Sequence, residues 1–379
     1  MDIKLYSFFS GAGFLDLGFE QAGFEIQFVN EYSHTFLNAY KYARKQMGII
    51  EPCRGYYNGD ITHFTLGEER EMLNNMVSED KRSSIVGFIG GPPCPDFSVA
   101  GKNEGFTGEN GRLTNTYKTL ILNNTPDFFV FENVKGLWST RKHREEYDKL
   151  KKSFNRKGYI LIDRLVNALE YGVPQDRDRV ILFGIHKSAT NLEINLLRKH
   201  LESEFDWGIV NQASVKEMKN MEWPSQTEFK EDMSMPFPEG IREDITVEYW
   251  FKKNNVYIHP NAYDYFKPRQ GIEKIQRICE GDVSRKSFKR LHRWRYSPTV
   301  AYGNNEVHLH PYKCRRLSVA EALSLQSMPE NFVINPMLTL TDKFKIIGNG
   351  VPFLMSNAIG TCIRDFLLEF VDENFIRGR

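Results

Sequence analysis

The sequence predicts an α/β protein in which a doubly wound, mostly parallel sheet is joined to a second, smaller and irregular domain. Over residues 4–186, apolar runs alternate with longer amphipathic stretches, and strands separated by helices imply crossover connections in a parallel sheet. Over residues 187–313 this alternation stops, and four tryptophans and several prolines appear instead. From Arg316 onward the regular pattern returns. A chain of 379 residues suits one large domain and one smaller domain.

Six apolar runs in the first half of the chain are the expected strands. They lie at residues 5–9, 26–30, 85–89, 128–131, 159–166 and 180–185. Helical periodicity is found between them, at residues 15–21, 116–123 and 144–156. Toward the C-terminus, a helix is expected over residues 318–326, shortly before Pro329, and a closing helix over about 352–370.

The composition is that of an ordinary globular protein, with 41% hydrophobic and 26% charged residues. No run approaches the roughly 18 apolar residues of a membrane span, and the N-terminus lacks the apolar stretch and cleavage site of a signal peptide. We therefore expect a cytoplasmic protein. The five cysteines are scattered without a Cys-x-x-Cys pair, which argues against a disulfide framework and predicts no metal site.

Two reactive groups follow the apolar runs at 85–89 and 128–131. The first run leads into a Gly-Pro loop that presents Cys94, and the second ends on Glu132. If both runs are parallel strands, both groups lie just past the carboxyl ends of strands, where open α/β sheets place their ligands. A thiol beside a carboxylic acid suits addition to a pyrimidine ring, in which the sulfur attacks C6 and the acid protonates N3. The thiol would need a pKa below its usual value of about 8.5.

Six blocks of the sequence resemble, in order, the motifs of the DNA cytosine-5 methyltransferase family of the bacterial and phage restriction–modification type. The blocks are Phe9-Ser10-Gly11-Ala12-Gly13, Pro93-Cys94, Glu132-Asn133-Val134, Gln175-Asp176-Arg177-Asp178-Arg179, Arg316-Leu317-Ser318-Val319-Ala320-Glu321 and Gly348-Asn349-Gly350-Val351-Pro352. Each block alone is a moderate signal, but all six in this order would rarely occur by chance. The resemblance covers most of the chain and implies methyl transfer to C5 of a cytosine flipped out of double-stranded DNA.

The resemblance also implies the fold, the domains and the catalytic roles. The fold would be that of the S-adenosylmethionine-dependent methyltransferases, with a catalytic domain at 1–186 and 341–379, a target-recognition domain at 187–313 and a hinge segment at 314–340. Cys94 would be the nucleophile, and Glu132 would protonate N3. Arg177 and Arg179 would hold the cytosine O2 and a neighbouring phosphate, and would orient Glu132.

The region after the first strand indicates a nucleoside cofactor. A Gly-Ala-Gly turn at 11–13 is typical of dinucleotide sites, but the third glycine of that motif is replaced by Asp16. Glu31 stands twenty residues after the first glycine, where a carboxylate can bind both ribose hydroxyls. The missing glycine disfavours a nicotinamide cofactor but not S-adenosyl-L-methionine, which has no pyrophosphate. By resemblance, the cofactor pocket is lined by Phe9, Gly11, Gly13, Glu31, Tyr32, Asp60, Ile61, Asn349 and Val351.

A basic segment lies in the irregular region, although the net charge of the whole chain is only +1. From Lys267 to Arg295 there are ten basic side chains against three acidic ones, with aromatic residues among them. A solvated surface explains this density about as well as a surface that follows DNA phosphates. We take the second interpretation and predict DNA contacts from Arg285, Lys286, Lys289 and Arg290.

Other function classes fit the sequence less well. An RNA cytosine-5 methyltransferase of the tRNA-modifying branch would share the catalytic blocks, but its Cys-Phe-Thr signature is missing from this sequence. A non-catalytic, cofactor-binding regulator of DNA would be expected to lose Cys94 or Glu132, and a thiol hydrolase would need a recognisable histidine partner. Pro95 stands where the family usually has glutamine, which affects contacts near the base more than the thiol chemistry.

The predicted partner is double-stranded DNA, with a cognate restriction endonuclease acting on the same site. We expect a monomer. The chain begins directly on its first strand, without the N-terminal regulatory domains of larger eukaryotic relatives, and this favours a bacterial or phage enzyme.

Overall fold

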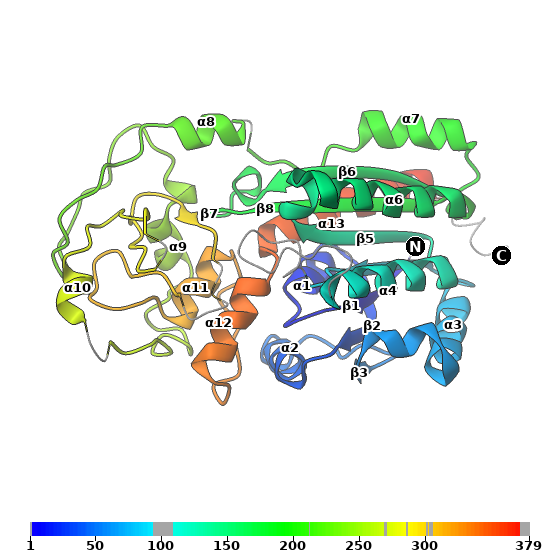
Figure 1. The fold of residues 1–379 in the computed structure, drawn as a ribbon, viewed down its shortest axis with the longest axis horizontal. Coiled ribbons are helices and arrows are strands. Elements are labelled where there is room, and N and C mark those ends of the chain that lie inside the picture. Colours follow the sequence, from blue (N-terminus) through cyan, green and yellow to red (C-terminus); the bar gives the residue numbers. More distant parts are fainter. Residues whose placement is uncertain are drawn as a thin grey trace.

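The apolar runs of the first half form one sheet, which the computed structural model places in the larger of two lobes (Figure 1). The structure describes residues 2–93, 109–211, 213–268, 271–285, 287–300, 302 and 306–371. The strands of the sheet are β1 (Ile3–Phe8), β2 (Glu25–Glu31), β3 (Tyr56–Asn58), β4 (Ile85–Gly90), β5 (Phe128–Val134), β6 (Tyr159–Asn167) and β8 (Asp178–His186). Their order is β3-β2-β1-β4-β5-β8-β6; the first five run parallel, and β8 is antiparallel to both neighbours. The predicted doubly wound, mostly parallel sheet is confirmed.

The six expected strands all occur, and the structure adds the short β3. Strands β4, β5 and β8 lie inside the sheet and are buried along most of their length. Burial on both faces explains their nearly continuous apolar sequences. β5 is longer than expected, because residues up to Val134 pair with β8. Glu132 therefore lies within the last residues of a strand and not beyond its end.

Helices cover both faces of the sheet. One face packs against α3 (Gly67–Asp80), α4 (Glu109–Asn124), α5 (Gly136–Ser139) and α6 (Arg141–Lys157). The other face packs against α1 (Phe14–Gln21), α2 (His34–Gln46), α7 (Ile194–Glu204) and α13 (Phe353–Phe370). The expected helices α1, α4, α6 and α13 are present, whereas α2, α3 and α7 are additions from the structure.

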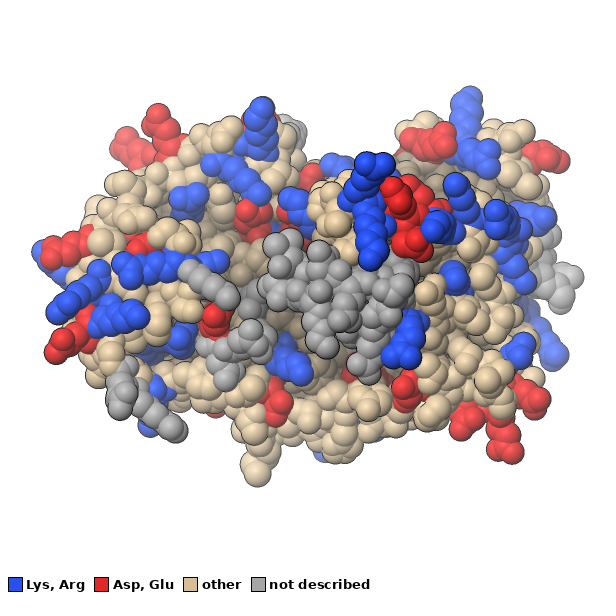
Figure 2. Space-filling view, viewed as in Figure 1, with Lys and Arg blue, Asp and Glu red and all other residues tan. Residues whose placement is uncertain are grey.

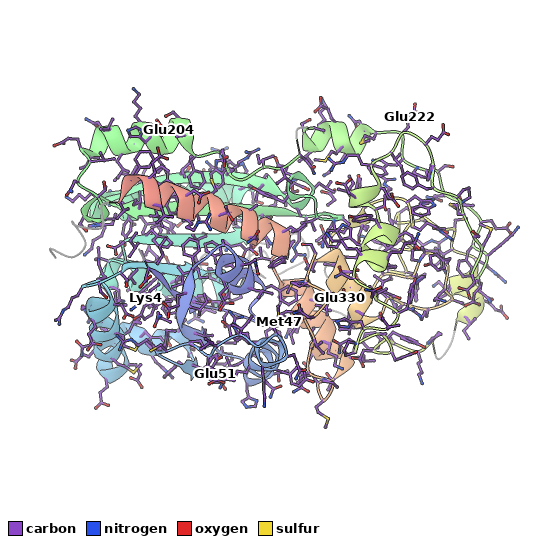
Figure 3. All side chains as sticks on the ribbon, turned by 180° about the vertical axis from the view of Figure 1, so that it is seen from behind. Lys4, Met47, Glu51, Glu204, Glu222 and Glu330 are labelled. Atoms are coloured by element: carbon purple, nitrogen blue, oxygen red, sulfur yellow. The ribbon has the colours of Figure 1, made fainter. Side chains whose placement is uncertain are left out.

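The last helix returns to the large lobe, as the resemblance implied. α13 lies along α1 (Figure 3), and the contact is so close that a Cβ added at Gly18 would stand 1.9 Å from Ser356 Oγ. The stretch Leu340–Phe370 is long and apolar enough to meet a criterion for a membrane span, but half of its apolar window is buried in the protein. Core helices meet the same criterion, and α13 contributes Met355, Ile359 and Ile363 to the core on the sheet.

The smaller lobe, on the left of Figure 1, consists of short elements and long connections. Its helices are α8 (Val215–Asn220), α9 (Val247–Lys253), α10 (Ile272–Gln276), α11 (Val319–Leu325) and α12 (Leu340–Asn349). Strand β7 (Gln175–Asp176) pairs with β9 (Ser297–Pro298) and connects this lobe to the sheet, because β8 begins at Asp178. Short 3-10 helices occur at Ile61–Thr65, Ala168–Tyr171, Lys187–Ala189 and Glu243–Ile245.

The packing shifts the predicted domain boundaries. α7 falls within the predicted recognition domain, but its Leu197 and Leu201 pack with Trp207 in the core on the sheet. α12 was assigned to the large domain, but it contacts both α11 and α2, and its Phe344 lies in a cluster that joins the small lobe to α1 and α2 of the large lobe. The segment 314–340 contributes α11 to the same cluster, which includes residues of both lobes. That this segment acts as a hinge stays a prediction. We therefore use "small lobe" for residues from about 208 to 349 and "large lobe" for the rest.

Buried polar side chains replace strand pairing in much of the small lobe. Arg293 and Glu280 form a two-point ion pair, with Nε 2.9 Å from Oε1 and Nη2 2.8 Å from Oε2. The guanidinium of Arg290 is buried and donates to four backbone carbonyls, those of Ile275, Ile278, His310 and Lys313. Backbone acceptors that find no strand partner are satisfied in this way.

Candidate active site

Glu132 and Arg179 meet on adjacent strands at the carboxyl end of β5. Arg179 Nε lies 2.7 Å from Glu132 Oε1, and about a tenth of each side chain is exposed (10% and 11%). Burial raises the pKa of Glu132, and the charges of Arg179 and Arg177 lower it; burial has the largest effect. A raised pKa favours the protonated carboxyl that can donate to a bound base.

Two glycines bring the loop after β4 against Glu132. A Cβ added at Gly91 would stand 2.5 Å from Glu132 Oε2, and one at Gly90 would stand 2.9 Å from the ring of Tyr117. A larger residue at either position would push the loop away from the carboxyl, so this approach requires glycine. Cys94 follows three residues after Gly91 and lies outside the described residues. Its role as the nucleophile therefore stays a prediction.

Arg177 lies away from the position that the sequence suggested. Its guanidinium is fully buried and donates to the backbone carbonyls of Val300, Gly348 and Gly350 at 2.8–3.0 Å. The residue sits in the gap between β7 and β8, so strand alternation with Arg179 does not hold there. Because these donors are committed to the backbone, the prediction that Arg177 holds the cytosine needs correction.

Two glutamines to which the sequence analysis gave no role of their own complete the cluster around Arg177. Gln175 Nε2 donates to the carbonyl of Leu325 at 3.0 Å, and its Oε1 accepts from the amide of Val300 at 3.1 Å. Gln326 Nε2 donates to the carbonyl of Ile347 at 2.6 Å. The cluster joins the chain segment leading to Arg179, the small lobe and the end of α12. The partners of Gln175 are more than 100 residues away in the chain, and such contacts leave no local pattern in a sequence.

The turn at 11–13 has the strained geometry of a binding loop. Phe9, Gly11 and Gly13 all have positive φ angles, of 53°, 59° and 81°. This conformation is uncommon in a non-glycine residue such as Phe9. A Cβ added at Gly13 would stand 2.6 Å from the ring of Tyr40. One added at Gly11 would meet no atom within 4 Å, so the turn has open space beside Gly11.

Glu31 ends β2 with its carboxylate fixed by two backbone amides. Oε2 accepts from Gly11 N and Oε1 accepts from Ser33 N, both at 2.8 Å. Burial raises the pKa of Glu31, and these hydrogen bonds lower it. Each oxygen of an ionised carboxylate keeps a further lone pair, so the group is oriented and can still accept from two hydroxyls. The neighbouring Tyr32 is 75% exposed, which leaves its ring available to a ligand.

Asp60 and Ile61 differ in what they can offer a cofactor. Asp60 caps the 3-10 helix that follows it by accepting from Thr62 N at 2.8 Å, and its side chain is partly exposed. The side chain of Ile61 is buried in the cluster that also contains Phe64. The Ile61 side chain therefore packs in the core, and its place in the lining of the cofactor pocket stays a prediction.

The C-terminal block reaches the same end of the large lobe. A Cβ added at Gly350 would stand 2.3 Å from the ring of Phe14, so this loop touches the start of α1. Asn349 is exposed at the end of α12. The Val351 side chain is buried in the core on the sheet, and its place in the lining of the cofactor pocket stays a prediction.

Asp16 has a structural role that explains why the third glycine is missing. Its buried carboxylate accepts from Ser7 Oγ at 2.8 Å and from Tyr40 OH at 2.9 Å. Burial raises its pKa, and Arg44, which is itself paired with Glu20, lowers it. The Asp16 carboxylate on α1 thus links β1 and α2 through these two hydrogen bonds, beneath the turn.

The predicted DNA contacts separate into surface and core residues. Arg285 has half of its side chain exposed and lines an open hollow of about 670 Å³ with Lys274 and Arg277. Lys289 is partly exposed, and Lys286 lies outside the described residues. The structure leaves Arg285 and Lys289 able to reach a phosphate.

Arg290 belongs to the core. Its guanidinium stacks on Phe229 at 3.7 Å from the ring centre, and burial lowers its pKa to about 10. The prediction that Arg290 contacts a phosphate was wrong, because its donors are used by backbone carbonyls inside the small lobe.

Comparison with known proteins agrees with the geometry at the end of β5. A family model described as C-5 cytosine-specific DNA methylase matches residues 3–365. The chain belongs to this family. It is a DNA cytosine-5 methyltransferase, and the resemblance inferred from the six blocks is confirmed.

Relatives of this methyltransferase align over nearly its whole length. Type II methyltransferase M.NmeDI of Neisseria meningitidis serogroup C is 51% identical over 366 residues, which cover 96% of this chain and 84% of the relative. Type II methyltransferase M.FnuDI of Fusobacterium nucleatum is 29% identical over 370 residues, which cover 97% and 96%. A putative DNA modification methyltransferase encoded within an E. coli prophage has a similar structure, with a TM-score of 0.65, 21% identity and coverage of 97% and 100%. At that identity the structural likeness supports the fold alone.

Proposed function

We propose that this enzyme methylates a cytosine flipped out of duplex DNA through a covalent adduct with Cys94, using S-adenosylmethionine as the methyl donor. One observation carries the proposal: the loop that leads to Cys94 leaves β4 against the carboxyl of Glu132. Arg179 contacts the other oxygen of the same carboxyl. A nucleophile next to an oriented acid is what addition across the C5–C6 bond of a pyrimidine requires.

The proposed steps divide between the two groups. The Cys94 thiolate adds to C6, while Glu132 gives a proton or a hydrogen bond to N3 as negative charge develops there. The ring becomes an enamine whose C5 is a carbon nucleophile. S-adenosylmethionine, when bound, supplies the electrophilic methyl group. The proton on C5 is then removed and the Cys94 thiolate leaves, which restores the aromatic base.

The residues at the Gly11 turn fit such a donor. Glu31 would accept from the two ribose hydroxyls, Tyr32 would stack on the adenine, and Asp60 would accept from its amino group. The support is that the Glu31 carboxylate is already oriented by two amides, and that the Tyr32 ring is exposed. The buried side chains of Ile61 and Val351 are left out of this proposal.

We further propose that the small lobe reads the DNA sequence, since the residues at the sheet edge serve the cytosine and the donor. Arg285 and Lys289, with Lys286, would contact phosphates and position the duplex without specifying its sequence. Both lobes are in one chain, which supports action as a monomer. Methylation-sensitive sequencing of DNA from cells that express the protein would give the recognition sequence.

The names of the relatives support a place in a restriction–modification pair. In this proposal the enzyme works in the cytoplasm, and a cognate endonuclease cuts the same sequence when it is unmethylated. A plasmid methylated by this enzyme should resist that endonuclease, and an unmethylated plasmid should be cut.

The experiment that tests the mechanism removes the thiol. Cys94→Ser should abolish methyl transfer and keep DNA binding, because a hydroxyl is rarely ionised near neutral pH. Cys53→Ser, at an exposed cysteine, is the matched control and should stay active. With 5-fluorocytosine at the target, the wild-type enzyme should form a denaturation-resistant adduct only when S-adenosylmethionine is present. Activity of Cys94→Ser within about tenfold of wild type would exclude the covalent route.

A second variant tests the acid. Glu132→Gln should lower the single-turnover rate about 10²–10⁴-fold with little change in DNA binding, since an amide cannot donate a proton as an acid does. An unchanged rate would show that Glu132 is not the acid and only ends a strand.

The substrate is tested with the wild-type enzyme. Methylation of tRNA in place of duplex DNA would favour the RNA alternative, and a lack of activity on both would favour a regulator.

A further inference from the structure

Helix α6 has one apolar face and one strongly basic face. Its buried residues recur at helical spacing and pack on the sheet: His143, Tyr147, Leu150 and Phe154. Six of the exposed side chains on this helix are basic, namely Arg141, Lys142, Lys149, Lys152, Arg156 and Lys157. Only Glu145 is both acidic and exposed. Figure 2 shows Lys and Arg side chains gathered over this helix.

Ion pairs within the helix do not neutralise this face. The acidic residues of α6 are already paired, Glu145 with Arg141, Glu146 with Lys149, and Asp148 with Arg144 and Lys151. Within the described part of the chain, no carboxylate lies within 4 Å of Lys142, Lys152 or Arg156. Lys149, Lys152 and Arg156 follow one another at intervals of three and four residues, a spacing at which like charges destabilise a helix. A polyanion bound to this face would relieve that repulsion.

The basic face begins next to the catalytic edge of the sheet. α5 is the only helix between β5, which carries Glu132, and α6 in the described chain, and it contacts both. The Arg144 guanidinium stacks on Trp138 of α5 at 3.9 Å from the ring centre and fixes the start of α6. Lys135 binds Asp178 at 2.8 Å, next to Arg179 on β8. A duplex held at Glu132 would therefore have this face beside it.

We propose that the basic face of α6 binds the phosphates of the duplex arm that leaves the active site across the large lobe. The helix is about 25 Å long, which matches about seven base pairs of B-DNA. In Figure 2 basic side chains are also seen on the same side of the molecule at the far end of the small lobe, around α10. The enzyme would thus hold DNA on both sides of the target base. The inference rests on duplex DNA as the substrate and on the proposed place of the target base at Glu132, but not on the proposed chemistry of Cys94.

The test compares three duplexes and two sets of substitutions. One duplex ends about three base pairs from the recognition sequence on both sides, and the others carry about ten more base pairs on one side or the other. The α6 variant is Lys142→Gln, Lys152→Gln and Arg156→Gln. The control variant is Lys45→Gln, Arg198→Gln and Lys199→Gln, three exposed basic residues on α2 and α7, which pack on the opposite face of the sheet. Both variants lose the same charge, and glutamine is a good helix former.

For wild type and the control variant, extending the arm that crosses α6 should raise the affinity for DNA. For the α6 variant, the same extension should not raise the affinity. On that long duplex, the slope of log affinity against log salt should fall by about 0.9 for each lost contact, or about 2.7 in the α6 variant. The footprint on that arm should recede by about seven base pairs. An α6 variant that keeps the gain overturns the proposal, as does an equal loss in the control, which would show only the effect of net charge. Failure of wild type to bind the long duplexes, and not only the short one, would instead count against duplex DNA as the substrate.

Discussion

The two lobes bury different kinds of side chain. In the large lobe the buried side chains on the sheet are mostly aromatic and aliphatic, and backbone groups pair from strand to strand. In the small lobe, buried polar side chains reach backbone groups that no strand satisfies. Asn254 donates to the carbonyl of Met328 at 2.7 Å, and Asn261 donates to that of Ile334 at 2.9 Å. Arg290 does the same for four carbonyls.

Because the two lobes bury different side chains, a basic residue in the sequence has a different structural role in each lobe. On α6 of the large lobe, Lys142, Lys152 and Arg156 lie outside an apolar core with no carboxylate partner in the described part of the chain, so a polyanion can reach them. In the small lobe, Arg290 and Arg293 are part of the core, although they belong to the same basic segment as the exposed Arg285. Counting charges along the chain therefore overestimates the DNA-binding surface of the small lobe. The predictions below test whether the two lobes are stabilised as differently as their contacts indicate.

The largest effect is expected from a cavity in the sheet core. Phe129 of β5 packs against Phe154 and Tyr159, with ring centres 4.4 Å and 5.0 Å apart. Phe129→Ala should lower the free energy of unfolding of the large lobe by about 3–5 kcal/mol in urea denaturation. Leu368→Ala, at an exposed position, should change it by less than about 0.5 kcal/mol. Equal effects of the two substitutions would contradict the packing of this core.

A smaller and local effect is expected from Arg290→Met. Methionine keeps the apolar stem but removes the only donor to the carbonyls of Ile278 and His310 among the described residues. Each such loss costs about 1–3 kcal/mol, so that we expect a loss of about 3 kcal/mol. Hydrogen exchange should accelerate at the amides of Leu291 and Leu309, which bond to backbone carbonyls of this region, and should stay unchanged in β4 and β5. Arg285→Met is the control, with little expected change. Equal acceleration in both lobes would show that they unfold as one unit.

The sequence predicted the strands of the large lobe better than the long-range polar contacts between the lobes. Periodicity located the strands around Ile89 and Val130, because apolar burial in a sheet leaves a repeating pattern. The motif blocks correctly brought Glu132 close to Arg179. They could not show that Arg177 faces backbone carbonyls, since a guanidinium bound to the backbone and one bound to a ligand look the same in a sequence. The boundaries at 187 and 341 moved because Leu197 and Phe344 pack on partners far away in the chain.

Acidic pH should weaken the small lobe through its buried histidines. Burial, together with the charges of Lys289 and Arg316, lowers the pKa of His308 to about 3, and burial also lowers the pKa of His310. The unfolded chain binds these protons near pH 6.5, so the stabilisation is complete above pH 6.5 and is lost as the pH falls toward 3. His308 alone should cost about 1.4 kcal/mol by pH 5.5. Hydrogen exchange at pH 7.5 and 5.5 measures the loss, and His308→Gln should remove this part of it. If hydrogen exchange in the sheet accelerated as much at pH 5.5, the small lobe would not be the more acid-sensitive of the two lobes.

The smallest effect on stability is expected at the exposed basic residues of the small lobe. Arg285→Gln and Lys289→Gln leave the core contacts of Arg290 in place, so the unfolding free energy should change by less than about 0.5 kcal/mol for each. If both side chains contact phosphates, target and non-target duplexes should lose affinity alike. The slope of log affinity against log salt should fall by about 0.9 for each substitution. Loss of affinity for the target duplex alone would assign these residues to base recognition. An unchanged salt slope would leave the hollow at Arg285 outside the DNA interface and restrict phosphate binding in the small lobe to other residues.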